Sequence, residues 1–287
     1  MQTRSLPFTT VPLPAKRICT ALAAVIMLLS AAGCSTPRVA GRAEAERQQS
    51  PCEQSYFMAK EDDATSSDPS RHIIMRYIAA THAASEWLDT AAYCPARFAD
   101  GTLRAARARV EARALASAMG VTVETPALAR FDGVDSLAVD KRSLTSLADA
   151  EDQAGFIMEV FAARSIGHAT LDISDRHKTA AQRLASFSGS DTSRAKAYEI
   201  ADLLANPSTM TDSATGLNAP TDAIVEINCA RGEITTVSES SSTSNSGESA
   251  SKDSRAQSLK TLSSAIADRV ETAFSWGYPT FDGALFE

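Results

Sequence analysis

Apolar side chains recur every three or four residues in six segments of the chain, which is the spacing of one face of an α-helix. Polar residues and many alanines lie between them, and alanine loses the least free energy on entering a helix. Only 13 of the 287 residues are glycine, so few positions interrupt the pattern. We therefore predict an all-α fold, with helices at residues 71–93, 102–119, 143–164, 172–187, 193–205 and 255–274.

Two polar stretches lie outside this pattern. Residues 34–70 contain three prolines and few apolar residues, which predicts a flexible tether with one possible short helix near residues 53–60. Residues 238–254 are mostly serine and other polar residues, which is typical of a flexible loop.

Residues 208–237 fit two interpretations. β-Branched residues flank Arg231 and Gly232, which is compatible with a short hairpin. The same residues are also compatible with a further long helix that begins at Pro220 or Thr221.

The N-terminus has the pattern of an export signal. Residues 1–33 carry three basic and no acidic side chains, and the run Ile18–Ala32 is apolar or small throughout. This run of 15 residues is shorter than the roughly 20 that a transmembrane helix needs, and it matches the apolar region of a signal peptide. It ends in Ala31-Ala-Gly-Cys34, which resembles a bacterial lipobox, although Ala31 stands where that motif prefers leucine. The resemblance implies lipidation of Cys34, including a palmitate-type acyl chain.

Charge and cysteine content agree with a secreted protein that does not bind nucleic acid. The chain has 28 basic and 35 acidic residues, and its net charge of −7 becomes −10 when residues 1–33 are removed. A strongly basic surface for nucleic acid is therefore excluded. Beyond the lipidation site the chain has three cysteines, and an oxidising compartment permits one disulfide. We expect one pair among Cys52, Cys94 and Cys229, and the sequence does not choose it.

Two predicted helices carry an ionisable residue on their apolar face. Glu151 interrupts the face of 143–164, and His177 interrupts the face of 172–187. A short link makes these helices antiparallel neighbours, so the two side chains are expected to meet. His82 and Glu86 share a face of the helix at 71–93. The four residues are candidates for a metal site between helices. The alternative, which we prefer, is a buried Glu–His pair that fixes helix register, with no metal and no cofactor.

The segments Ala150-Glu-Asp-Gln-Ala-Gly-Phe156, Glu159-Val-Phe-Ala-Ala-Arg164 and Ser174-Asp-Arg-His177 resemble the first helix pair of a ferritin-like four-helix domain, as found in uncharacterised actinobacterial proteins. The resemblance implies a four-helix bundle over residues 142–287, preceded by a helical pair and connector at 71–141. The family's Glu-x-x-His metal signature is absent from this sequence. Whether the two regions form one domain stays open.

The sequence thus predicts a lipid-anchored protein on the extracytoplasmic face of the cell membrane. We expect a structural or interaction role at the cell envelope without catalysis, with the membrane and an envelope protein as partners. The first alternative is a bundle that binds a metal or small ligand and has enzymatic activity at Glu151 and His177. The second is a solute-binding lipoprotein.

Overall fold

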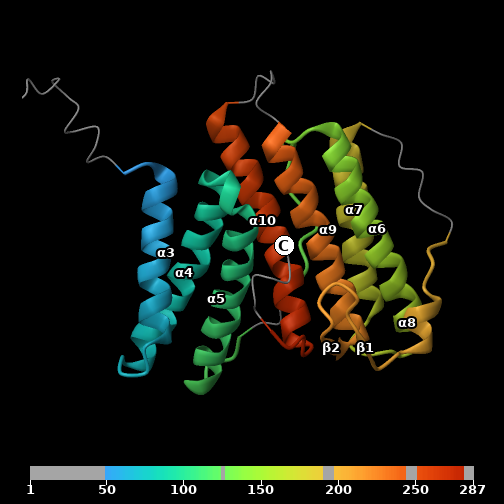
Figure 1. The fold of residues 1–287 in the computed structure, drawn as a ribbon. Helices are drawn as coiled ribbons and strands as arrows, with labels where there is room; N and C mark the ends of the chain where they lie inside the picture. The colour runs from blue at the N-terminus through green and yellow to red at the C-terminus, as the bar shows by residue number, and fades with distance from the viewer. Residues whose placement is uncertain (1–48, 124–126, 190–196, 244–250, 281–287) are drawn as a thin grey trace, which may run out of the picture. The chain divides into compact units, whose positions relative to one another are not determined.

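The computed structural model describes residues 49–123, 127–189, 197–243 and 251–280. The predicted leader at 1–33 and the predicted lipidation site Cys34 lie outside the described residues. In the described residues the regular secondary structure is helical apart from two short strands, which confirms the all-α fold (Figure 1). The elements are α3 (Pro51–Ser67), α4 (Ile73–Tyr93), η1 (Pro95–Arg97), α5 (Phe98–Ala118), α6 (Lys141–Ala163), α7 (Leu171–Ser188), α8 (Ala201–Ala205), β1 (Thr209–Thr211), β2 (Asn218–Pro220), α9 (Thr221–Thr243) and α10 (Lys252–Ser275).

Helix α3 lies inside the segment predicted to be a flexible tether and is longer than the possible short helix expected near residues 53–60, so the tether prediction is wrong for residues 51–67. The Ser50 side chain accepts a hydrogen bond from the Glu53 N–H, and the Glu53 carboxylate accepts one from the Ser50 N–H. This reciprocal capping, with proline at the first position, starts a helix without a strong apolar face. Packing against α4 and a disulfide then hold α3 in place.

Within 208–237, residues 221–237 form the long helix rather than a hairpin around Arg231 and Gly232. Helix α9 starts at Thr221, one of the two predicted positions. Its buried residues recur at helical spacing, namely Ile224, Ile227, Ile234 and Val237. The strands instead lie just before it, where Met210 of β1 pairs with Ala219 of β2 in antiparallel register. The apolar face of α9 therefore decided between the two interpretations.

Two predicted boundaries next to segments outside the described residues also change. The helix expected at 193–205 is helical only at Ala201–Ala205 among its described residues. The Glu199 carboxylate accepts a hydrogen bond from the Ala201 N–H and so satisfies a donor at the start of α8. The serine-rich loop expected at 238–254 is helical at both ends, where α9 and α10 extend into it. The middle of that loop, 244–250, lies outside the described residues.

One hydrophobic core joins the N-terminal helices to the rest of the described chain. Helix α10 packs against α4 and α5 on one side and against α9 on the other, α9 also packs against α6, and α6 packs against α7. Figure 1 shows α10 and α9 between the two flanking groups of helices. A single cluster of buried residues contains Trp87 of α4, Leu144 of α6, Leu184 of α7 and Ile266 of α10. The regions 71–141 and 142–287 therefore share one core.

None of the helices in the described part of the chain is long and apolar enough to cross a membrane.

Candidate functional site

A group of five ionisable side chains lies buried where α6, α7, α9 and α10 meet. We call it the buried charge cluster: Glu151, His177, Glu226, Glu233 and Arg269. Four of the five are fully buried, and Glu233 is 2% exposed. Helix α6 supplies the first residue, α7 the second, α9 the two further glutamates and α10 the arginine. Every one of the four helices therefore places at least one ionisable group in the same interior.

The predicted contact between Glu151 and His177 is present. The Nδ1 atom of His177 is 2.6 Å from Glu151 Oε2, and its Nε2 atom is 3.1 Å from Glu226 Oε1. Each ring nitrogen thus faces a carboxylate oxygen. Two lone pairs cannot share such a line, so each of the two contacts needs a proton. The imidazole either donates on both sides as a cation, or one carboxyl group carries the second proton.

Arg269 links this arrangement to the opposite side of the bundle. Its Nη2 atom pairs with Glu151 Oε1, and its Nε atom lies 3.3 Å from Glu233 Oε2. Its Nη1 atom donates to the carbonyl of Ala265 in the preceding turn of α10. The guanidinium therefore contacts carboxylates from α6 and α9 at once, which is a place that a bridging cation would take in a metal-binding bundle.

Burial controls the ionisation of several groups in and beside the cluster. Desolvation, assisted by the nearby charge of Glu226, raises the pKa of Glu233 well above its ordinary value. Desolvation also lowers the pKa of Arg269 to about 9, so the guanidinium is still charged at neutral pH. The charged guanidinium and the proton shared around His177 offset carboxylate charge in the cluster, which lowers the cost of burying it.

Cys229 lies beside the cluster and completes a set of potential metal ligands. Ligand atoms of Glu151, His177 and Cys229 lie within 4.8 Å of one another, the one such group of three found among the described residues. Burial first, and then the charges of Glu233 and Glu226, raise the pKa of the thiol well above its ordinary value. A thiol binds metals as the thiolate, so this environment opposes the use of Cys229 as a ligand.

His82 and Glu86 are not part of this interior. Both lie on α4, where His82 is exposed and Glu86 is half-buried. Helix α4 packs against α3, α5 and α10, whereas the buried charge cluster occupies the other side of the molecule. The hypothesis of a joint site with Glu151 and His177 is therefore wrong. Partial burial, and then repulsion from Asp89 and Asp62, raise the pKa of Glu86 at this surface.

The sequence interpretation missed three members of the cluster. Glu226 and Glu233 are buried on α9, a segment that the sequence left open between a helix and a hairpin, and Arg269 is buried on α10 beside apolar residues that had been assigned to its inward face. Arg269 follows Ile266 by three positions and precedes Val270 by one, so it falls on the predicted apolar stripe of its helix. A charged residue on an apolar stripe had identified Glu151 and His177 as candidates, and Arg269 shows the same signal.

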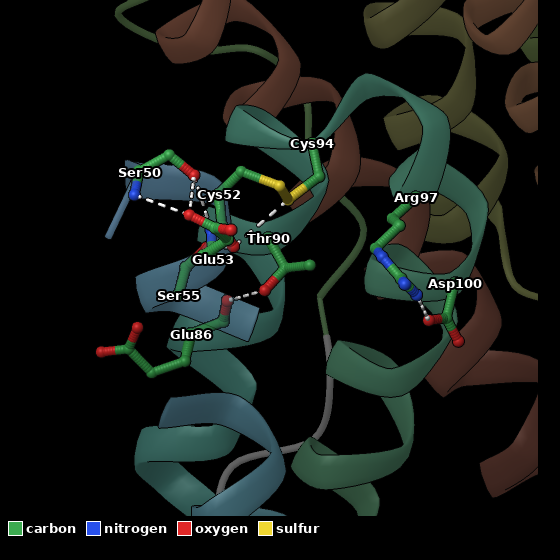
Figure 2. The surroundings of a disulfide bond; sticks show 9 residues. All are labelled: Ser50, Cys52, Glu53, Ser55, Glu86, Thr90, Cys94, Arg97 and Asp100. Carbon is green, nitrogen blue, oxygen red and sulfur yellow. Dashed lines mark hydrogen bonds and ion pairs between the residues drawn. A yellow bond between two sulfur atoms is a disulfide. The ribbon is translucent and has the colours of Figure 1, made fainter. Parts of the chain in front are cut away.

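The disulfide joins Cys52 to Cys94, and Cys229 is a free, buried thiol. Cys52 belongs to the first turn of α3, and Cys94 directly follows α4. Figure 2 shows the bond beside the capping pair Ser50 and Glu53. The disulfide therefore fastens the start of α3 to the end of α4, across 42 residues of sequence.

Comparisons of the chain with protein-family models, with curated proteins and with solved structures found no match.

Proposed function

We propose that the protein is an extracytoplasmic lipoprotein, anchored to the cell membrane through acyl chains on Cys34, with a structural or interaction role at the cell envelope. The observation that carries this proposal is the disulfide between Cys52 and Cys94. Disulfides persist in oxidising compartments and are rare in the cytosol of most organisms. The bond supports the same compartment as the lipobox-like leader, and the two observations come from different residues.

An interaction role is supported by apolar side chains on α3 and α4. Five large ones are 42–55% exposed: Phe57, Met58, Ile74, Met75 and Ile78. The two helices form the flank of the protein that follows Cys34 most closely in sequence. Exposed apolar groups of this kind favour contact with another protein or a membrane surface. An envelope protein is the partner that we propose.

We also propose that α6, α7, α9 and α10 have the arrangement of a ferritin-like four-helix domain. Helices α6, α7, α9 and α10 surround a polar interior to which each contributes, which is how four-helix domains build their sites. In this protein Arg269 pairs with two of the carboxylates. We propose that the guanidinium replaces a metal ion and that the cluster fixes the register of the four helices.

Anchoring is tested by expressing the full chain and its Cys34→Ala variant in a bacterial host that processes lipoproteins. We expect the wild-type chain in the membrane fraction, with an intact-mass increase that matches diacylglyceryl and acyl groups on residue 34. The variant should lose that mass and leave the membrane fraction. Cys19→Ala, which changes a cysteine inside the leader, is the matched control and should behave as wild type. A wild-type chain without the added mass would overturn the proposal.

A second candidate function is a metal or ligand site in the buried charge cluster. One observation favours it: Glu226 Oε2 is buried and has no hydrogen-bond partner among the described residues. Metal content of purified residues 35–287 tests this candidate, with Glu226→Gln as the variant. We expect no stoichiometric metal. About one equivalent of iron, manganese or zinc that is lost in the variant would make the metal site the preferred function.

A further inference from the structure

His168 lies in the loop between α6 and α7 and is held from several sides. Its backbone N–H donates to Asp222 Oδ2 at 2.6 Å, and its ring Nδ1 is 2.9 Å from the same oxygen. The indole of Trp276 stacks on the imidazole, with 5.4 Å between ring centroids and 10° between planes. Asp222 is 2% exposed in the first turn of α9, and Trp276 directly follows α10. Three separate elements therefore fix one half-exposed ring.

The backbone of this loop is shaped for the same contact. Ser165 and Gly167 have φ angles of 55° and 57°, and serine rarely adopts this left-handed conformation. Such conformations persist where the surroundings impose them, and they concentrate at functional sites. A Cβ atom at position 167 would lie 2.3 Å from Asp222 Oδ2. Glycine at this position is therefore what allows the carboxylate to reach His168.

The ring of His168 borders a pocket of about 370 Å³. This volume lies within the range of small-molecule sites in proteins. Leu128, Ile173 and Trp276 give the pocket an apolar wall, and Arg176 of α7 adds a cation. Apolar walls with a few convergent polar groups are the usual composition of a ligand site.

Two of the residues that line this pocket, His168 and Arg176, each keep one side-chain nitrogen without a partner among the described residues. The Nδ1 atom of His168 is within hydrogen-bond distance of Asp222, so Nε2 is the ring nitrogen that has no partner among the described residues. Arg176 donates through Nε to Asp172 and through Nη1 to the carbonyl of Leu128, which leaves Nη2. The second oxygen of Asp222 accepts from the Ala223 N–H, so both oxygens of that carboxylate are already engaged.

Each of these nitrogens is of a chemical type that binds an oxygen of a carboxyl group. Guanidinium and imidazolium N–H groups form strong charge-assisted hydrogen bonds with carboxylates. If the imidazole is neutral, with its proton on Nδ1, its Nε2 atom accepts the proton of the acid itself. Whether the imidazole is protonated or neutral, one proton lies between a ligand oxygen and the Nε2 atom of His168. We do not propose a metal ion in this pocket, because the group of three potential metal ligands found among the described residues lies in the buried charge cluster.

We propose that this pocket binds a small organic acid, whose carboxyl group lies between His168 and Arg176 and whose apolar body packs against Leu128 and Ile173. This site is separate from the buried charge cluster and does not depend on the proposed anchoring.

Benzoate is the probe, because it combines a carboxylate with a compact apolar body. Binding to residues 35–287 is followed by the NMR shift of the His168 ring proton and by the change in tryptophan fluorescence, to which Trp276 at the pocket and the buried Trp87 of α4 both contribute. Benzyl alcohol tests the need for the acid, and inorganic phosphate tests the need for the apolar body. His168→Gln and Arg176→Gln remove the two proposed contacts. His82→Gln, the same change at an exposed histidine of α4, is the matched control.

We expect saturable benzoate binding with a dissociation constant in the millimolar range, as is usual for so small a ligand. Each pocket variant should weaken it about tenfold or more, because a charge-assisted hydrogen bond is lost, and His82→Gln should not change it. Circular dichroism shows whether the variants are folded, and the shift of the His168 ring proton in the wild-type chain gives a result even if a variant is not. The proposal is overturned if benzyl alcohol or phosphate binds as well as benzoate. It is also overturned if no probe shifts the His168 signal, or if benzoate binds equally well to both pocket variants.

Discussion

The contact between α4 and α5 includes many buried alanines and Gly101, whereas the interior of α6, α7, α9 and α10 combines its apolar residues with the buried charge cluster. Ala80, Ala83 and Ala91 of α4 are fully buried, as are Ala105 and Ala106 of α5. On the other side, His177 and Arg269 connect carboxylates from two helices. Both interiors are buried, but ion pairs require particular partners, whereas contacts between alanines do not.

The two kinds of contact differ mainly in how strictly they fix the register of the helices, and less in how much they stabilise the fold. Alanines at close contact gain dispersion energy with any well-packed neighbour, so the α3–α5 side needs a second constraint, and the disulfide provides one. Buried charges are satisfied by particular partners only, and any shift of one helix leaves a charge unpaired. The buried charge cluster therefore selects one arrangement of its four helices without a covalent link.

The largest expected effect comes from removing the one guanidinium of the cluster. Arg269→Met fills a similar volume but leaves the buried carboxylates without their cation. We expect a loss of about 3–5 kcal/mol in the free energy of unfolding, because breaking a buried ion pair strands its partner. Urea denaturation followed by circular dichroism measures it. Arg142→Met, at an exposed position of α6, should change the free energy by less than about 0.5 kcal/mol.

A double variant sharpens this prediction. In Arg269→Met with Glu151→Gln, one stranded charge is also removed, so the combined loss should be smaller than the sum of the two single losses. Additive losses would mean that Arg269 and Glu151 do not interact in solution.

The disulfide should contribute the next largest effect, on the other side of the comparison. Cys52→Ser with Cys94→Ser opens a link across 42 residues, which should lower the free energy of unfolding by about 2–4 kcal/mol. Added reductant should destabilise the wild-type chain by a similar amount and leave the double variant unchanged. If reductant destabilises the variant too, the stabilisation does not come from this bond.

Close helix contact is tested at a glycine of α5. A Cβ on Gly101 would lie 2.7 Å from the Trp87 carbonyl oxygen and 2.8 Å from the Ala91 nitrogen, both backbone atoms of α4. Gly101→Ala must therefore push the helices apart, at an expected net cost of about 1–3 kcal/mol. Thermal and urea unfolding measure this cost.

The control is the same substitution in α9. Gly232 is exposed, and a Cβ there meets no other atom within 4 Å, so Gly232→Ala should stabilise the protein by up to about 1 kcal/mol through helix propensity. Equal effects at the two positions would contradict the packing described for α4 and α5.

The two sides also differ in what their sequences predict. Helices with an apolar stripe were located within a few residues, because burial of that stripe is what forms them. Helix α3 was expected only as a possible short helix near residues 53–60, because its buried residues include Ser55, Ala59 and Ser66, which do not form a strong apolar stripe. The contact of Glu151 with His177 was predicted from two interrupted stripes. The contacts of Glu226, Glu233 and Arg269 were not predicted, because tertiary contacts between distant segments decide which charged side chains meet.

The smallest expected effect lies at the boundary between the two sides, where α5 packs against α10. Arg109 Nη1 donates to Asp268 Oδ1 at 2.6 Å. Burial outweighs this contact and raises the pKa of Asp268 from 3.8 to about 6. The folded state therefore holds this proton more tightly than the unfolded state does. Its contribution to stability is full below pH 3.8 and is lost as the pH rises through about 6.

We expect the free energy of unfolding of the wild-type chain to fall between pH 4 and pH 6 relative to that of Asp268→Asn. A shift of this size corresponds to roughly 3 kcal/mol at most, and partial exposure of both side chains, 21% each, reduces it to about 1 kcal/mol. Asp175→Asn, at an exposed position of α7, is the control and should follow the wild-type curve. The relevant quantity is the difference between variants, because Glu233 titrates in the same direction. A wild-type chain that becomes more stable than Asp268→Asn over this range would show that the ion pair with Arg109 dominates over burial.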